Sequence, residues 1–335
     1  MTEALRIAVV GVGRMGAFHA RTLAKASTLD VVAVADAAPG VAAGVAGDLG
    51  IVGFESTDAL LERDDVEAWV VATPTPTHGG LTGSALEAGL HVLCEKPLSL
   101  DPVESDVLGA QAATLERVLQ VGFWRRFAPP WVRAREVLDA GRIGRPLMIR
   151  LAQWDADPPP AEFCDPTISG GLAIDCGVHE YDLAEWLSGL AVERVTARNL
   201  PLVDEALGTA GDVDNLVAVL DLAGGAVAIV DLSRNARYGD DVRTEILGAE
   251  GAVFVDLLPT GRTRLAIGDG IAVVPGSEAA DAVAAGVVGQ AEAFAARVRG
   301  RFGDVPGAAA STRALQIGRA VQESAATGAP IPIGP

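Results

Sequence analysis

The sequence is poor in cysteine and histidine. It contains three cysteines, Cys94, Cys164 and Cys176, and four histidines among its 335 residues. The cysteines are too few and too widely spaced for a disulfide framework or for the paired CxxC spacing of a zinc site. We therefore expect a reducing, cytoplasmic setting and no bound metal.

Long apolar runs and long basic runs are also missing. No stretch of about 20 apolar residues is present to span a bilayer, and glycines interrupt the apolar segment after MTEALR before it reaches the length of a secretory signal. The longest basic run is Arg125-Arg126, and the formal net charge is −18. Because a phosphate-binding surface needs net positive charge, we expect neither a membrane nor a nucleic acid as partner.

Hydrophobic residues make up 50% of the chain, which is long enough for two domains. In the first half, strand-like apolar runs alternate with helical stretches near residues 58–61 and 79–88, and this alternation predicts a parallel sheet. A DPVE segment at 101–104 predicts a capping box that begins a helix to about residue 117. The strand-like runs cover residues 6–10, 31–35, 51–54, 66–73, 91–95 and 118–123.

A glycine-rich turn, GVGRMG at 11–16, follows the first strand-like run. Gly11 suits the tight turn, Gly13 lets the backbone approach a pyrophosphate, and Gly16 allows a helix to pack closely on the strand. The N-terminus of that helix would then face the phosphates. The pattern predicts a dinucleotide site, and the alternative is a glycine turn in some other α/β protein.

Asp36 ends the second strand, 20 residues beyond Gly16. A carboxylate there accepts hydrogen bonds from ribose hydroxyls and repels a 2′-phosphate, and the AAP segment that follows has no arginine to hold such a phosphate. We therefore expect NAD rather than NADP. The expected cofactor-binding residues lie at this edge and at the ends of the next two strands: Gly11, Gly13, Arg14, Met15, Gly16, Asp36, Thr73, Pro74, His78, Glu95 and Lys96.

Those next two strands end in TPTPTH at 73–78 and CEKP at 94–97. Ligands bind at the carboxyl ends of strands in open α/β sheets. Lys96 can present its ammonium group to a substrate hydroxyl or a developing alkoxide there, or it is an ordinary surface lysine. For His78, the first residue of a helix is a simpler interpretation than a catalytic group.

Residues 169–189 bring scarce residue types together. Read as one helix, Asp175, His179, Asp182 and Trp186 fall on a single stripe beside an apolar stripe. Asp175 lies one turn from His179, so its carboxylate can orient the imidazole and raise its pKa. Such a pair suits proton abstraction from an alcohol. The alternative is a surface helix whose Asp and His are merely solvated.

Four separated segments resemble one known family. They are GVGRMG at 11–16, CEKP at 94–97, GFWRRF at 122–127 and SGG…DxxxHxxD at 169–182, and they resemble the glucose-fructose oxidoreductase / inositol dehydrogenase / rhizopine-catabolism (Gfo/Idh/MocA) family. Residues 235–245 are similar to the YGYDxRxE segment of inositol 2-dehydrogenases in that family, and Asp155 with the prolines at 158–160 is similar to their RDPxPPP loop. A cis peptide before the proline of EKP is common in the family.

The resemblance also implies roles for individual residues. His179 matches the general base, Lys96 matches the residue that binds the reacting oxygen, and Asp175 completes the catalytic trio. Two residues depart from the pattern, Asp240 in place of a second tyrosine and Trp154 in place of a basic residue. These departures point toward an inositol isomer, an aminated derivative or another sugar alcohol. The implied substrate-binding residues are Lys96, Arg126, Asp155, Asp175, His179 and Tyr238, with Asp182 a further candidate.

For the fold, we expect a Rossmann domain over residues 1–123 and an α+β domain with a large, mostly antiparallel open sheet over 124–335. The last helix is a candidate to pack back on the first domain. The resemblance implies that the second face of the sheet packs on another subunit, so we expect a dimer or tetramer. The expected elements are helices at 128–140, 279–298 and 308–326, a loop at 155–167, and strands at 146–154, 193–199, 214–222, 226–233, 241–247, 252–257, 264–267 and 271–274.

These features together predict an NAD-dependent dehydrogenase that oxidises a secondary ring hydroxyl of a cyclic polyol to a ketone, with an inositol as the first candidate substrate. A related sugar or amino-cyclitol is the second candidate. A non-catalytic sensor of NAD or sugar is the alternative from another functional class.

Overall fold

The computed structural model describes residues 3–156, 159–160, 162–257, 262–267, 270–275, 279–301, 303 and 305–334. The chain forms two compact units. Unit 1 comprises Met1–Trp124 with Gly286–Thr312, and unit 2 comprises Arg125–Ala285 with Arg313–Pro335. Pro158 of the expected proline-rich loop lies outside the described residues.

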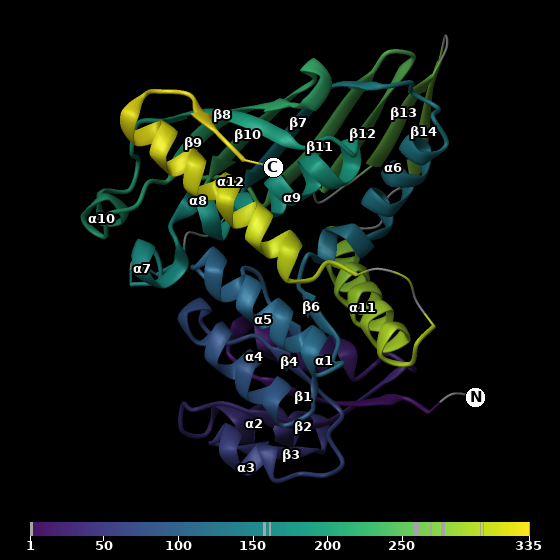
Figure 1. Cartoon of the computed structure of the whole chain (residues 1–335), viewed down its shortest axis with the longest axis vertical. Helices are drawn as coiled ribbons and strands as arrows, with labels where there is room; N and C mark the ends of the chain where they lie inside the picture. Colours follow the sequence, from purple (N-terminus) through teal and green to yellow (C-terminus); the bar gives the residue numbers. More distant parts are fainter. Residues whose placement is uncertain are drawn as a thin grey trace. The chain divides into compact units, whose positions relative to one another are not determined.

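Unit 1 is built on a six-stranded parallel sheet in the order β3-β2-β1-β4-β5-β6 (Figure 1). Its inner strands are buried on both faces, which explains the continuous apolar runs in the sequence. The strand order reverses between β1 and β4, and ligands bind at such a reversal in open α/β sheets. The strands are β1 (Leu5–Val10), β2 (Leu29–Ala35), β3 (Val52–Phe54), β4 (Ala68–Val71), β5 (His91–Cys94) and β6 (Leu119–Val121).

The helices of the first 124 residues are α1 (Arg14–Leu23), α2 (Val41–Leu49), α3 (Thr57–Leu61), α4 (His78–Glu87) and α5 (Pro102–Thr114). The expected capping box at the start of α5 is only half formed. Asp101 accepts a hydrogen bond from the Val103 N–H at 2.9 Å, but Glu104 accepts from the Ser99 hydroxyl instead of turning back to Asp101. The sequence interpretation missed α2, whose small apolar residues and glycines show little amphipathic pattern.

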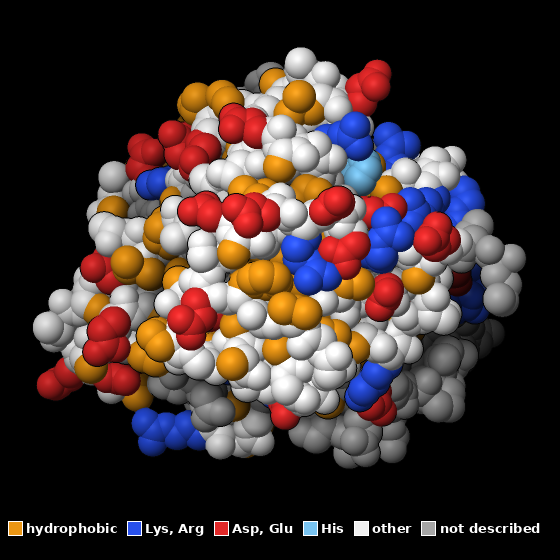
Figure 2. Space-filling model, turned by 90° about the horizontal axis from the view of Figure 1, so that it is seen from below, with side chains coloured by type: hydrophobic (Ala, Val, Ile, Leu, Met, Phe, Trp, Pro, Cys, Tyr) orange, Lys and Arg blue, Asp and Glu red, His pale blue; other side chains and the backbone are white. Residues whose placement is uncertain are grey.

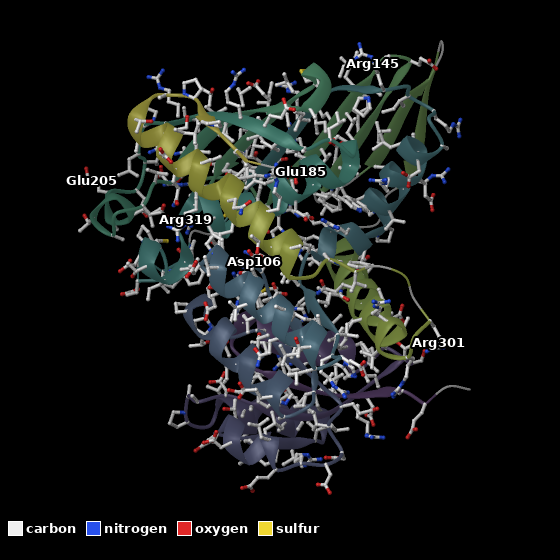
Figure 3. All side chains as sticks on the ribbon, in the orientation of Figure 1. Asp106, Arg145, Glu185, Glu205, Arg301 and Arg319 are labelled. Atoms are coloured by element: carbon white, nitrogen blue, oxygen red, sulfur yellow. The ribbon has the colours of Figure 1, made fainter. Side chains whose placement is uncertain are left out.

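The second half of α11 (Ala279–Val298) completes the core of unit 1. Val287, Ala291 and Phe294 are buried in one cluster with residues of β1, β2 and α1. The last helix, α12 (Ala308–Thr327), starts in unit 1 and continues in unit 2. Thr312 donates to Asp106 of α5 at 2.7 Å within unit 1, and Arg313 donates to Glu185 at 3.0 Å within unit 2 (Figure 3 labels Asp106 and Glu185).

Unit 2 contains a nine-stranded sheet in the order β14-β13-β12-β11-β7-β10-β9-β8-β15. Only the β7–β10 pair is parallel among its described pairings, so the sheet is mostly antiparallel and the expected fold class is confirmed. The strands are β7 (Pro146–Trp154), β8 (Val192–Asn199), β9 (Asn215–Leu222), β10 (Val227–Ser233), β11 (Asp241–Gly248), β12 (Gly251–Leu257), β13 (Arg262–Ile267), β14 (Gly270–Pro275) and β15 (Ile331–Pro332).

One face of this sheet packs against helices α6 (Pro129–Asp139), α8 (Leu172–Asp175) and α9 (Gly177–Ser188). Side chains alternate between the faces along each strand, so Ile149 and Leu151 of β7 are buried on the helix side. On the other face, Val219 and Leu247 are 38% and 44% exposed. Two short helices were not expected: α7 (Pro166–Ser169), which begins at the end of the predicted loop 155–167, and α10 (Glu205–Thr209).

None of the helices in the described part of the chain is long and apolar enough to cross a membrane. No group of three or more His, Cys, Asp or Glu side chains in the same residues is arranged to hold a metal ion.

Glu116, just after α5, supplies a test of backbone strain. It has φ +54°, the one positive φ of a non-glycine residue in the described ranges, at a position where helices commonly end in glycine. We predict that Glu116→Gly raises the free energy of unfolding by about 1 kcal/mol relative to Glu116→Ala, because only glycine adopts this conformation without strain. Chemical denaturation measures this, and the alanine variant controls for the lost charge. Equal stability of the two variants would contradict the prediction.

Candidate functional site

The turn between β1 and α1 is so tight that two of its glycines are required by the fold itself. Gly11 has φ +80°, and a Cβ atom there would lie 2.5 Å from Cγ2 of Thr73. A Cβ atom on Gly16 would lie 1.7 Å from the Gly11 carbonyl oxygen. Gly13, by contrast, has open space around its Cβ position. The protein's own packing therefore does not require a glycine at this position, and the open space beside it is where the predicted pyrophosphate would approach.

The N-terminus of α1 is available to an anion. Gly13 is its N-cap, no described side chain caps the helix, and its first turn contains no acidic residue. Arg14 and Met15 are exposed at this end. Because the first N–H groups of a helix have no partners within it, this terminus fits the pyrophosphate of a dinucleotide.

Asp36, at the end of β2, is fixed by two backbone hydrogen bonds. Its Oδ2 accepts from the Val12 N–H at 2.8 Å, and its Oδ1 accepts from the Ala38 N–H at 2.9 Å. Each carboxylate oxygen can accept further hydrogen bonds. The carboxylate therefore braces the glycine turn and still fits its expected role of accepting from ribose hydroxyls.

His78 ties together the loops that follow β4 and β5. Its Nδ1 lies 2.8 Å from the Pro97 carbonyl oxygen and its Nε2 lies 2.8 Å from the Thr73 carbonyl oxygen. Both acceptors need an N–H donor, so the geometry favours the imidazolium form. Burial lowers the pKa of His78, but neighbouring Cys94 and the two carbonyls raise it to about 9. The ring nitrogens of this predicted cofactor-binding residue are thus engaged by backbone.

Glu95 and Lys96 follow β5. Glu95 Oε1 lies 2.7 Å from Nε2 of His19, which is fully buried in α1. Burial raises the pKa of Glu95, but the hydrogen bond from His19 and the nearby positive charges lower it below its usual value. Lys96 is half-buried, and the Lys96–Pro97 peptide is cis, as the family resemblance implies.

The expected single stripe over residues 169–189 is interrupted in unit 2. α8 ends at Asp175 and α9 begins at Gly177, so Cys176 lies between two helices. Gly177 belongs there because a Cβ atom at this position would lie 2.4 Å from the Tyr181 hydroxyl oxygen. His179 is 6% exposed and lies in the first turn of α9.

The second half of the stripe pairs with arginines. Arg126 donates to both carboxylate oxygens of Asp182, with Nε–Oδ2 and Nη2–Oδ1 distances of 2.8 and 2.5 Å. The guanidinium carbon atoms of Arg126 and Arg135 each lie 5.8 Å from the Trp186 ring centre. Burial raises the pKa of Asp182, and Arg126 only partly offsets this effect. The predicted substrate residue Arg126 and the candidate Asp182 are therefore partners of each other.

Arg234, which the sequence interpretation missed, links the other half of the stripe to the rest of unit 2. Its side chain is fully buried, and its Nη2 lies 3.5 Å from Asp175 Oδ2 and 3.3 Å from Asp212 Oδ2. Its Nη1 donates to Sγ of Cys164 at 2.9 Å. Burial lowers the pKa of Arg234, but the facing thiols and carboxylates more than offset this and raise it. Asp212 in turn accepts from the Leu172 N–H at 2.9 Å, at the start of α8.

A second buried chain of contacts reaches Asp155. Arg125 pairs with Glu180, and its Nη2 donates to Gln153 Oε1 at 2.8 Å. Gln153 Nε2 then donates to Asp155 Oδ1 at 3.1 Å, and the Cys176 thiol donates to Asp155 Oδ2 at 3.3 Å. Burial raises the pKa of Asp155, assisted by the charges of Asp175 and Asp240. Asp155 and Asp175 thus both lie near one thiol, since Cys176 Sγ is also 3.9 Å from Asp175 Oδ2.

The structure assigns new surroundings to the three remaining residues singled out in the sequence. Tyr238 is 66% exposed, and its hydroxyl donates to Asp241 at 2.9 Å. Asp240 accepts from the backbone N–H of Ala156 at 2.8 Å. Trp154 belongs to β7, and its indole N–H donates to Asp231 of β10 at 2.5 Å. Successive strand residues point to opposite faces, so Trp154 lies on the other face of the sheet from the buried Gln153, which donates to Asp155.

The predicted site residues are therefore divided between the units. Unit 1 holds the cofactor residues and Lys96, whereas unit 2 holds Asp175 and His179. Sequence analysis missed five buried polar partners in unit 2: Arg125, Gln153, Glu180, Asp212 and Arg234. The strand register contained a signal for two of them, because Gln153 and Arg234 continue the buried alternation of β7 and β10.

The chain is similar to known proteins along most of its length. A family described as "Oxidoreductase family, NAD-binding Rossmann fold" matches residues 5–123, and one described as "GFO/IDH/MocA C-terminal domain" matches residues 131–254. The scyllo-inositol 2-dehydrogenase (NAD(+)) of Bacillus subtilis is 36% identical over 260 residues, which are 77% of this chain and 75% of that protein.

Two solved structures are similar to the whole chain. A putative myo-inositol dehydrogenase from Sinorhizobium meliloti has a TM-score of 0.89 and 32% identity, with 99% of this chain and 100% of that one covered. GenD2 from gentamicin A biosynthesis, in complex with NAD, has a TM-score of 0.88 and 29% identity, with 100% and 98% covered.

Gly13 allows cofactor binding to be separated from folding. We predict that Gly13→Ala changes the free energy of unfolding by less than about 0.5 kcal/mol, because its Cβ would meet open space. The same change should weaken NAD binding about tenfold, because the methyl group would stand where the pyrophosphate approaches. Calorimetric NAD titration and denaturation measure the two effects. Gly16→Ala is the contrasting variant, which we expect to lose stability as well. Unchanged NAD affinity in Gly13→Ala would disprove the assignment.

Proposed function

Because the chain belongs to the GFO/IDH/MocA oxidoreductase family, we propose that it oxidises a secondary ring hydroxyl of a cyclic polyol to a ketone with NAD, and that an inositol is its substrate. The observation that carries this proposal is the presence of Lys96, Asp175 and His179 together in a chain with an intact NAD turn. The names of its relatives, scyllo-inositol 2-dehydrogenase and myo-inositol dehydrogenase, support the choice of substrate.

In this mechanism His179 accepts the proton of the reacting hydroxyl. Asp175, at the end of α8, orients the imidazole and stabilises the imidazolium that forms. Lys96 donates a hydrogen bond to the same oxygen and stabilises its alkoxide character. Bound NAD supplies the hydride acceptor. Asp155 and Tyr238 are the proposed groups that recognise neighbouring hydroxyls.

Arg234 is proposed as a positioning residue that acts through Asp175. It touches no reacting atom in this mechanism, but its guanidinium holds Asp175 and Asp212 at 3.5 and 3.3 Å from one nitrogen. Asp212 also caps α8, the helix that ends in Asp175. A single buried cation thus determines both where α8 starts and how its last carboxylate is oriented.

A second candidate substrate class is an aminated cyclitol or amino sugar. The charges of Asp175 and Asp240 both raise the pKa of Asp155, so three carboxylates in unit 2 act on one another. A substrate ammonium group would relieve that repulsion, whereas a neutral polyol would not. The similarity to a protein of gentamicin A biosynthesis supports this candidate.

Assembly and location are further parts of the proposal. The sheet face that carries the exposed Val219 and Leu247 suits contact with a second copy of the chain, so we propose a dimer or tetramer. The mass of the purified protein in solution, compared with 34.3 kDa for one chain, tests this.

The three cysteines are buried and form no disulfide with one another, which suits the proposed cytoplasmic setting.

The substrate assignment is tested by NADH formation across myo-, scyllo- and chiro-inositol, amino-cyclitols and aldoses, with NADP in parallel. We expect preferred turnover of an inositol with NAD, and His179→Ala should lower kcat about 10³-fold while NAD affinity stays unchanged. Turnover confined to aminated substrates would change the assigned substrate class and leave the proposed mechanism unchanged. Tight NAD binding without turnover of any compound would favour a non-catalytic sensor.

The role of Arg234 is tested by its pH profile. We predict that Arg234→Gln lowers kcat about tenfold and moves the acidic limb of the kcat profile to higher pH, because loss of the cation that faces Asp175 favours the protonated form of the proposed base, His179. Arg234→Lys keeps the charge and should restore the limb in part. NAD affinity should be unchanged in both variants. If both variants lose activity with the wild-type pH profile, Arg234 has only a structural role.

A further inference from the structure

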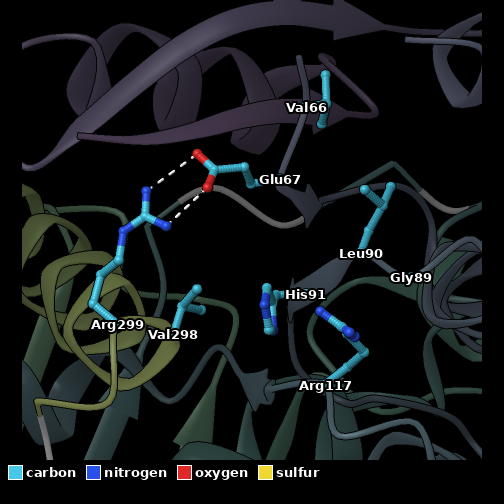
Figure 4. A pocket seen from close by; sticks show the side chains of 8 residues that line it. All are labelled: Val66, Glu67, Gly89, Leu90, His91, Arg117, Val298 and Arg299. Atoms are coloured by element: carbon cyan, nitrogen blue, oxygen red, sulfur yellow. Dashed lines mark hydrogen bonds and ion pairs between the residues drawn. The ribbon is translucent and has the colours of Figure 1, made fainter. Parts of the chain in front are cut away.

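A hollow in unit 1 lies at the opposite edge of the parallel sheet from the cofactor turn. It has a volume of about 300 Å³ and opens where β4, β5 and β6 begin, between Glu67, His91, Arg117 and Arg299 (Figure 4). The cofactor residues follow the carboxyl ends of the same strands. Four strand residues at about 3.3 Å each separate the two edges by roughly 13 Å, so the hollow is a separate site.

The one carboxylate of the hollow is already neutralised. Glu67 accepts from Nη1 and Nη2 of Arg299 at 2.8 and 3.2 Å, and from the backbone N–H of Arg6 at 3.0 Å. Nη2 of Arg6 lies 3.6 Å from the same carboxylate. Burial raises the pKa of Glu67, but these partners lower it below its usual value. Arg6, Arg117 and Arg299 therefore face two carboxylates, Glu67 and Glu3, because Glu3 pairs with Arg6 at 3.2 Å. This leaves an excess of one positive charge around the hollow.

Arg117 supplies the uncompensated positive charge. Its Nε donates to the Leu115 carbonyl at 3.3 Å, and no described residue accepts from its two terminal nitrogens. The backbone N–H of Arg117 donates to the Ala112 carbonyl at 2.9 Å, directly after the left-handed residue Glu116. The end of α5 thus directs this arginine into the hollow, where Figure 4 shows it beside His91.

His91 adds a neutral donor. Its Nδ1 accepts from the Val118 N–H at 2.9 Å, so the proton of the neutral ring lies on Nε2. Burial and the charge of Arg117 lower the pKa of His91 to about 4. His91 is the least buried of the four histidines. On the face of the molecule that Figure 2 shows, basic side chains lie among acidic ones and do not cover the surface evenly.

We propose that this hollow binds a small tetrahedral dianion, a sulfate or phosphate group, through the Arg117 guanidinium and the His91 Nε2–H. Planar guanidinium donors match the oxygens of such an anion. The net charge of the chain is −18, so the molecule as a whole repels anions. Anion binding therefore needs a local group of positive side chains such as this one. Neither NAD binding nor the proposed hydride transfer uses these residues.

Binding at this position is linked to protons. The groups that face His91 are Arg117 and Arg299, which lower its pKa, and Glu67, which raises it. A bound dianion offsets the two cations and raises the pKa of His91, so the complex takes up a proton where the free protein does not. Affinity for sulfate, whose charge is constant over this range, therefore increases as the pH falls from 7 toward 5.

The test is calorimetric titration of the NAD-saturated protein with sulfate, at an ionic strength held constant with sodium chloride. Saturation with NAD keeps sulfate away from the glycine turn. We expect saturable binding that is at least about tenfold weaker in Arg117→Gln, partly restored in Arg117→Lys and unchanged in Arg21→Gln. Arg21 is a matched control because it is half-exposed on α1 and pairs only with Asp48 among the described residues.

Several results would overturn the proposal. They are equal sulfate affinity in Arg117→Gln and wild type, an equal loss in Arg21→Gln, or binding of acetate as tight as that of sulfate. Inorganic phosphate should bind like sulfate at a pH above its second pKa, where it too is a dianion. Because Arg117 is outside the proposed catalytic machinery, NAD-dependent turnover should be unchanged in Arg117→Gln. Failure of the substrate panel would therefore leave this titration unaffected, and the two proposals fail separately.

Discussion

The cost of removing charged groups from water governs how the site of unit 2 is built. Arg125, Glu180, Asp182 and Arg234 are all buried, and an unpaired charge in such a position would destabilise the fold by several kcal/mol. Each is therefore matched with a partner on another element. These pairings attach α8 and α9 to the ends of β7 and β10, which are distant in sequence. The positions of Asp175 and His179 are in this sense set by charge compensation among residues that perform no chemistry.

Local signals explain what could be predicted from the sequence. The glycine turn, Asp36 and the strand-end segments of unit 1 depend on residues near one another in the chain, and their backbone requirements are specific enough to be recognised. The same holds for strand β7, whose predicted bounds match the structure. The half-formed capping box of α5 shows the limit, because Ser99 competes for Glu104 and nothing in the DPVE pattern reveals that competitor.

Long-range pairing explains what could not be predicted. Helical periodicity predicted that Asp175 and Asp182 lie on one stripe. In the structure the helix is broken at Cys176, where Gly177 packs against Tyr181. Asp182 pairs with Arg126, which lies outside the segment. Some of this was accessible. Arg234 continues the inward alternation of β10, and a charge in that register must have buried partners. Lys96 is also one of only two lysines in the chain, and this rarity favours a specific role for it over that of an ordinary surface lysine.

The way His78 joins two loops has a consequence for how this protein can diversify. Because its ring nitrogens lie within hydrogen-bonding distance of the carbonyls of Thr73 and Pro97, the loop after β4 and the loop that contains Lys96 are held to each other. An insertion in either loop would disturb both, so neither can be remodelled alone. Tyr238, by contrast, is mostly exposed, and its hydroxyl donates only to Asp241 in its own segment among the contacts of the described residues. A substitution at Tyr238 can therefore change the surface there while the two joined loops of unit 1 are left undisturbed.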